Sequence, residues 1–132
     1  MSPATILEVN RRAELVYGYP AADLVGMPAS DLVPEDARPL ALTIVGRVQQ
    51  GETVTAEATH QRRDGTRFPV RVIAAPDPTE DGHMIVTVED ITAERQRRSE
   101  AEAIASERLR IAQEIHDGVA QNLAAVRFKS AL

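Results

Sequence analysis

The segment Arg63-Asp-Gly-Thr-Arg-Phe-Pro-Val70 decides the fold because it joins a tight turn to an alternating strand. The Asp64–Gly65 pair is a strong hairpin signal, since glycine readily adopts the positive φ that tight turns require. Apolar residues alternate with polar ones on both sides of this turn: Val54, Ala56 and Ala58 before it, and Phe68, Val70, Val72 and Ala74 after it. This period of two predicts an antiparallel strand pair with one buried face.

Signals on either side extend this hairpin into an α+β domain. Upstream, the pattern predicts a strand over 4–9, followed by a helix over 11–17 that Asn10 caps. It then predicts a helical turn within 20–26 and a single turn that Ser30 or Asp31 caps. A longer helix is predicted over 34–50. Downstream, it predicts a third strand over 83–91. Gly18 and Gly51 are the expected helix stops.

The composition changes after Ile91. Residues 93–117 contain no proline and are rich in Glu, Arg, Ala and Gln, which predicts a long helix or a coiled-coil linker. Ser99 and Glu102 have the spacing of a capping box, so a helix break near residue 99 is one option.

Composition excludes several classes of function. The net charge of −5 argues against a general nucleic-acid binder, which needs a basic face. The chain has no cysteine, which excludes disulfides, thiolate metal sites and a covalent flavin–cysteine adduct; no metal site is predicted. No apolar run approaches the roughly 20 residues of a membrane span, so we expect a cytoplasmic protein.

The strongest lead to function is the helical stretch Glu107-Arg-Leu-Arg-Ile-Ala-Gln-Glu-Ile-His-Asp-Gly-Val-Ala-Gln-Asn-Leu123. Its apolar residues recur at helical spacing: Leu109, Ile111, Ala112, Ile115, Val119 and Leu123, followed by Val126 and Phe128. His116 falls on the flank of this stripe, Asp117 follows it, and Gln121 lies one turn beyond Asp117. Taken alone, a His beside an Asp on a helix indicates a surface or half-buried histidine with a solvated acid next to it, rather than a functional site.

Motifs along residues 4–92 resemble those of PAS domains. The matching pieces, in order, are Val9-Asn10, Gly18-Tyr19, Leu24-Val-Gly26, Pro34-Glu-Asp36, Arg63-Asp-Gly-Thr66, Phe68-Pro-Val70 and Val88-Glu-Asp-Ile-Thr92. The resemblance implies an antiparallel sheet flanked by short helices. The family's first strand should precede Ala4, so we expect four strands instead of five and one uncovered edge. A truncated start, a partner chain and another segment are alternative accounts of that strand.

Asp90, Ile91 and Thr92 match the element through which PAS domains pass signals to the following helix. An acid and a hydroxyl at a strand-to-helix junction can cap free amides of that helix. An ordinary helix cap is the alternative interpretation of the same residues.

The motif over 107–132 resembles the phospho-accepting helix of bacterial sensor histidine kinases, in the subfamily that pairs with helix-turn-helix response regulators. The resemblance implies that His116 accepts the phosphoryl group. It also implies that Asp117 orients the imidazole ring or acts as the base, and that Gln121 positions water for the phosphatase step. It also divides the chain into a PAS sensor domain over 1–92, a signalling helix or coiled-coil linker over 93–106, and an incomplete dimerisation and phosphotransfer domain over 107–132.

A complete kinase of this family also has a second bundle helix and an ATP-binding domain, neither of which occurs before Leu132. We therefore expect no kinase activity from this chain alone, and contact with ATP only through that absent domain. The expected partners are a second copy bound through the C-terminal helix, the cognate response regulator and the ATP-binding domain of the parent protein. No nucleic acid and no membrane segment are expected.

The ligand of the sensor domain is unknown from sequence. The helix over 34–50 has no histidine to serve as an axial haem ligand, and His60 and His83 are expected to be surface residues at strand ends. The alternative function is a non-enzymatic module for dimerisation, protein interaction or small-ligand binding, in which His116 is never phosphorylated.

Overall fold

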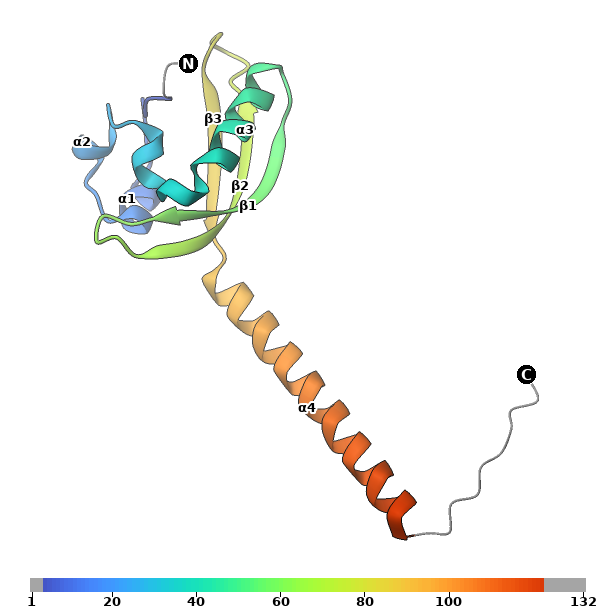
Figure 1. Ribbon diagram of the computed structural model, residues 1–132. Helices are drawn as coiled ribbons and strands as arrows, with labels where there is room; N and C mark the ends of the chain where they lie inside the picture. The colour runs from blue at the N-terminus through green and yellow to red at the C-terminus, as the bar shows by residue number, and fades with distance from the viewer. Residues whose placement is uncertain (1–3, 123–132) are drawn as a thin grey trace. The chain divides into compact units, whose positions relative to one another are not determined.

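The structure is a computed structural model that describes the backbone of residues 4–122 and the side chains of residues 4–118 (Figure 1). The chain divides into two compact units, the first ending at Ala93 and the second beginning at Glu94. This division lies one residue after the domain end that the sequence predicts.

The first unit contains a three-stranded antiparallel sheet in the order β1-β2-β3. Its strands are β1 (Val54–Gln61), β2 (Arg67–Pro76) and β3 (Met84–Asp90). The predicted hairpin is confirmed: Gly65 has a φ of 84°, and the Arg62 amide donates to the Thr66 carbonyl over 2.9 Å. The turn sets the register that pairs His60 with Phe68, and β2 in turn pairs Val70 with Asp90.

One face of the sheet supplies most of the core, as its alternation predicts. Phe68, Val70, Val72 and Ala74 of β2 are all buried, and they pack with Val54 of β1. The longest helix of this unit, α3 (Arg38–Gln49), contributes Ile44 and Val48 to the same cluster and packs against β1 and β2 (Figure 1).

Short helical segments precede α3: α1 (Arg11–Tyr17), α2 (Ala21–Leu24), and the 3₁₀ turns η1 (Ala29–Leu32) and η2 (Glu35–Ala37). As predicted, the Asn10 side chain caps α1 by accepting from the Ala13 amide over 3.0 Å. Gly18 ends α1 in the left-handed conformation. The predicted cap by Ser30 or Asp31 is wrong, because the residue before η1 is Pro28 and no side chain caps this turn.

The helix predicted over 34–50 is divided at Arg38. Pro39 has no amide hydrogen and is tolerated only in the first turn of an α-helix, so α3 begins at Arg38. The preceding residues form the 3₁₀ turn η2 instead.

The strand predicted over residues 4–9 is wrong, and so is the expected count of four strands. Thr5 forms only an isolated bridge with Pro28, and the Ile6 amide donates to the Met27 carbonyl over 3.0 Å. These residues bond to the segment after α2 instead of joining the sheet. Within residues 4–122, β3 pairs with β2 alone, and Ile85 and Val86 of β3 are 53% and 46% exposed. One uncovered edge is therefore present, as expected.

The helix α4 (Thr92–Asn122) begins with the last two residues of the first unit, and from Glu94 onward it belongs to the second. The helix is continuous through Ser99, so the predicted break is wrong. Its neighbours there are Arg, Glu and Ala, which all favour helix. The predicted helical residues from Leu123 to Leu132 lie outside the described residues.

The expectation that His60 is a surface residue is wrong. Its Nδ1 lies 2.7 Å from the Tyr17 hydroxyl, and its ring is 5.8 Å from the Tyr17 ring and 6.5 Å from the Phe68 ring. Burial raises the pKa of Tyr17, so its hydroxyl keeps its proton, and the tautomer of His60 determines which group donates in this bond. Burial lowers the pKa of His60 to about 4, because a charged imidazole would lose its hydration here.

This shift predicts a pH dependence of stability. As the pH falls from 6.5 towards 4, the unfolded chain binds a proton at His60 before the folded protein does. The free energy of unfolding therefore falls on acidification, by up to about 1.4 kcal/mol per pH unit from this residue. Urea denaturation of His60→Gln across this range should show a shallower pH dependence than the unchanged protein.

The matched control is His83→Gln, which removes a half-exposed histidine whose Nδ1 lies 3.1 Å from the Glu80 carboxylate. Titration of the carboxylates affects both variants in the same way and cancels in the comparison. Equal slopes for His60→Gln and the unchanged protein would show that His60 is not a source of the pH dependence.

Candidate functional site

The predicted phospho-acceptor lies on the exposed surface of α4. The side chains of His116 and Asp117 are 85% and 68% exposed. The His116 Nδ1 and the Asp117 Oδ1 are 3.9 Å apart, too far for a hydrogen bond. Consecutive helical residues point about 100° apart, which explains why the two groups are adjacent without being aligned. A reactant can therefore reach the imidazole freely.

Gln121 belongs to the same helix, within the bounds of α4. Its backbone lies one turn beyond Asp117, as the sequence predicts, and its side chain lies outside the described residues. The structure thus places the three predicted residues on one helix, and the His116 and Asp117 side chains are not hydrogen-bonded to each other.

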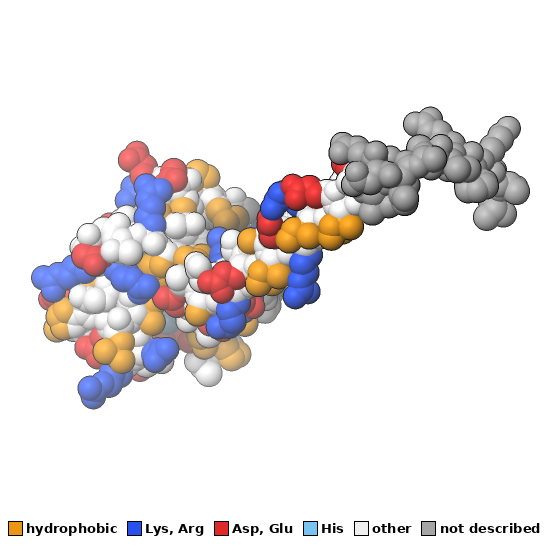
Figure 2. All heavy atoms as spheres, turned by 90° about the horizontal axis from the view of Figure 1, so that it is seen from below, with side chains coloured by type: hydrophobic (Ala, Val, Ile, Leu, Met, Phe, Trp, Pro, Cys, Tyr) orange, Lys and Arg blue, Asp and Glu red, His pale blue; other side chains and the backbone are white. Residues whose placement is uncertain are grey.

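Apolar and charged side chains occupy different sides of α4. Hydrophobic side chains form a line along the helix, with charged side chains beside it (Figure 2). Ile104, Ile111 and Ile115 fall within an arc of about 40°, and each is at least 43% exposed. On the other side, Arg110 pairs with both Glu107 and Glu114. Burial of such isoleucines is worth about 1.5–3 kcal/mol each, a strong driving force for association.

The three predicted coupling residues meet at the start of α4. The Asp90 Oδ1 accepts from the Thr92 amide over 2.9 Å and from the Thr92 hydroxyl over 2.6 Å. Ile91 between them is only 1% exposed, and its amide donates to the Pro69 carbonyl over 3.0 Å. The carboxylate thus satisfies a free amide of the first helical turn, while Ile91 anchors that turn to the sheet.

Arg62 joins this junction, although sequence reasoning missed it. Its Nη2 lies 2.8 Å from the Asp90 Oδ2, its Nη1 donates to the Val16 carbonyl, and its Cζ lies 3.9 Å from the centre of the Phe68 ring. Arg62 precedes the Asp64–Gly65 turn, but nothing in its local sequence points to a residue 28 positions later. The register of β1, β2 and β3 brings the two together.

The electrostatics of Asp90 favour its charged form. Burial alone would raise the pKa of this carboxyl. The hydrogen bonds from Thr92 and Arg62 together outweigh burial, and the pKa of Asp90 is lowered. Asp90 is therefore ionised at neutral pH, when its bonds to Thr92 and Arg62 are strongest.

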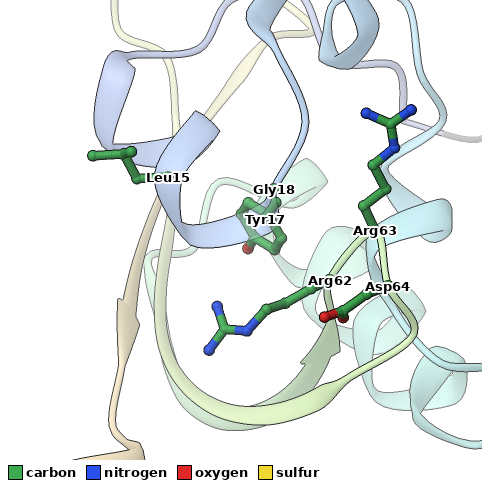
Figure 3. A pocket seen from close by; sticks show the side chains of 6 residues that line it. All are labelled: Leu15, Tyr17, Gly18, Arg62, Arg63 and Asp64. Carbon is green, nitrogen blue, oxygen red and sulfur yellow. The ribbon is translucent and has the colours of Figure 1, made fainter.

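A pocket of about 460 Å³ opens between the end of α1 and the β1–β2 turn (Figure 3). It is lined by Leu15, Tyr17, Gly18, Arg62, Arg63 and Asp64. Among residues 4–118, no cluster of His, Cys, Asp or Glu is placed to hold a metal ion. Within the same described part of the chain, no helix is long and apolar enough to cross a membrane.

Comparison with protein families gives two matches. Residues 2–93 match the family described as PAS domain, and residues 107–132 match the family described as Histidine kinase. The first match covers most of the chain and the whole sheet. The second contains His116, Asp117 and Gln121. No curated protein matches the chain.

Solved structures support the same fold. A domain of a sensory box sensor histidine kinase/response regulator from Geobacter sulfurreducens is 24% identical, with a TM-score of 0.56 over 64% of this chain and 72% of that one. The PAS domain of a protein from Colwellia psychrerythraea is 26% identical, with a TM-score of 0.56 over 67% and 79%. A blue-light activated histidine kinase from Erythrobacter litoralis is 20% identical, with a TM-score of 0.58 over 88% and 41%.

The geometry at Asp90 predicts the effect of removing its charge. Asp90→Asn keeps one oxygen that can accept from Thr92 but weakens the bonds to Thr92 and Arg62. We expect a loss of about 1 kcal/mol in the free energy of unfolding and faster hydrogen exchange at the Thr92 amide. Urea denaturation and amide exchange measure the two effects.

Asp77→Asn is the matched control. The Asp77 Oδ1 accepts from the amide and hydroxyl of Thr79 over 2.8 and 2.7 Å, the same local motif as at Asp90, but in a loop with no helix after it. An Asp77→Asn variant as destabilised as Asp90→Asn would mean that the motif has no special role at the helix junction.

Proposed function

The chain belongs to the PAS domain family, and from this premise we propose that it senses a signal and relays it to a phospho-accepting histidine. It combines a PAS sensor domain with the dimerisation and phospho-acceptor segment of a histidine kinase. We propose that Asp90, Ile91 and Thr92 transmit changes in the sensor to α4. The match over residues 107–132, with His116 exposed at its centre, is the observation that carries this proposal.

In the proposed reaction, a neutral imidazole nitrogen of His116 attacks the γ-phosphoryl group of ATP. A nitrogen–phosphorus bond forms, the bond from phosphorus to the bridging oxygen breaks, and ADP leaves. Asp117 would orient the ring or accept its proton. Their separation of 3.9 Å requires only a side-chain rotation for a hydrogen bond to form. Gln121 would position a water molecule for the phosphatase step, in which the phosphoryl group passes to water and inorganic phosphate leaves.

The proposed partners follow from the same segment. The apolar line along α4 fits a second copy of the chain, because a single helix cannot bury these isoleucines on itself. A response regulator would receive the phosphoryl group, and an ATP-binding kinase domain would supply it. These partners suit a cytoplasmic location. A non-enzymatic dimerisation module is the rival function, and the exposed apolar line on α4, which serves association without any phosphorylation, is the observation that favours it.

The first test is phosphorylation. The chain is incubated with labelled ATP and the ATP-binding domain of a histidine kinase, supplied as a separate protein. We expect acid-labile label on the unchanged chain and none on His116→Gln, because no other nitrogen has the same context. His83→Gln, which alters another histidine that solvent reaches, should retain full labelling.

Label on neither the unchanged chain nor His83→Gln, across several donor domains, would favour the non-enzymatic module. Equal label on His116→Gln and the unchanged chain would place the acceptor elsewhere.

The second test is association through α4. Ile111→Glu places a charge in the apolar line, where burial would cost several kcal/mol, so we expect the variant to sediment as a monomer at concentrations where the unchanged chain is a dimer. Gln113→Glu makes the same charge change at an exposed position outside this line and should remain dimeric. If Ile111→Glu sediments like the unchanged chain, the line on α4 is not the interface.

A further inference from the structure

Arg62 connects three parts of the first unit that are distant in sequence. Its guanidinium donates to the Val16 carbonyl in the last turn of α1 and stacks over the Phe68 ring in the core. It also pairs with Asp90, the residue that caps α4. Because the side chain of Arg62 is 27% exposed and that of Asp90 30%, their ion pair remains within reach of solvent.

The same guanidinium borders the pocket between α1 and the β1–β2 turn. Figure 3 shows the Arg62 side chain extending from the turn past Tyr17, while Leu15 projects from the helix. The Arg62 side chain therefore lines the pocket and also pairs with Asp90, which caps α4. Within the described part of the chain, no other pocket-lining residue forms a hydrogen bond or an ion pair with Asp90.

The lining of the pocket carries two cations, Arg62 and Arg63, and one acid. The Arg63 guanidinium is directed away from that of Arg62 (Figure 3) and lies 5.7 Å from the centre of the Tyr19 ring, so Arg62 is the cation that a ligand in the pocket would meet. The single acid of the lining, Asp64, is held at the turn, where its Oδ1 accepts from the Thr66 amide over 2.9 Å. A carboxylate matches the fork of a guanidinium, and an apolar body would lie against Leu15 and Tyr17.

We propose that this pocket binds a small organic carboxylate, which competes with Asp90 for the Arg62 guanidinium and thereby weakens the cap of α4. Binding of the carboxylate is inferred from the residues that line the pocket. The effect of this binding on signalling rests on the proposed function.

The energetics suit a switch. An ion pair that is partly exposed contributes little to stability, so a second carboxylate can displace it without a large loss. Arg62 stays in place during the exchange, since the Val16 carbonyl and the Phe68 ring continue to hold it. Asp90 then keeps its hydrogen bonds to Thr92 but loses its ion pair with Arg62. A ligand with different affinities for the paired and unpaired states shifts their populations.

The test uses butyrate as the probe and butyramide as its neutral counterpart. We expect butyrate, but not butyramide, to shift the amide NMR signals of Leu15, Gly18 and Arg63 at millimolar concentration. We also expect saturating butyrate to increase hydrogen exchange at the Thr92 amide by about threefold, the ratio that fits a weak ion pair.

Three variants separate the steps. Arg62→Gln should weaken butyrate binding by about tenfold, since it removes the charge that holds the carboxylate. Arg67→Gln is the matched control, because Arg67 pairs with Asp36 and does not line the pocket. It should bind butyrate like the unchanged chain. Asp90→Asn should still bind butyrate, while exchange at Thr92 should no longer respond to it.

Equal shifts with butyramide and butyrate, or unchanged binding in Arg62→Gln, would overturn the carboxylate site. Binding with no change in exchange at Thr92 would overturn the competition with Asp90. None of these measurements depends on phosphorylation, so failure of the proposed function at His116 is seen separately, in the labelling experiment.

Discussion

One residue, Ile91, separates β3 from α4, and this tight connection makes the start of the helix depend on the sheet. Its side chain is 1% exposed and its amide bonds to the Pro69 carbonyl, so it cannot move without disturbing the core. Asp90 on one side and Thr92 on the other are tied to each other by two hydrogen bonds. These contacts tie the first turn of α4 to the end of β3 and to Pro69 of β2.

The two units have opposite physical characters. The first buries its large side chains between sheet and helices, with Leu24 and Val70 fully shielded from water. The helix after Ala93 leaves Ile104, Ile111 and Ile115 exposed and forms charge pairs such as Arg110–Glu114 on its other side. A buried domain suits the detection of a signal, and an exposed apolar helix suits association. The two functions proposed for the chain thus fall on different units.

Local patterns predicted the features that neighbouring residues control. The Asp64–Gly65 turn, the buried face of β2 and the Asn10 cap each depend on a few adjacent side chains, and each is confirmed. The strand over 4–9 was not predictable in this way, because strand formation needs a partner and residues 4–6 bond to 26–29 instead. The sequence also contains Pro39, but the residue at which α3 begins depends on the 3₁₀ turn that precedes it, which the local pattern does not predict.

By itself, the sequence determined the class of the fold, the place of the junction at Asp90–Thr92, and the position of His116 on an amphipathic helix. Turn chemistry, helical periodicity and a motif within one helix suffice for these. Only the tertiary structure decided that His60 lies against Tyr17 and that Arg62 reaches Asp90. Those contacts join residues 43 and 28 positions apart. Strand register brings Arg62 to Asp90, and the position of α1 beside β1 brings Tyr17 to His60; no local pattern encodes either.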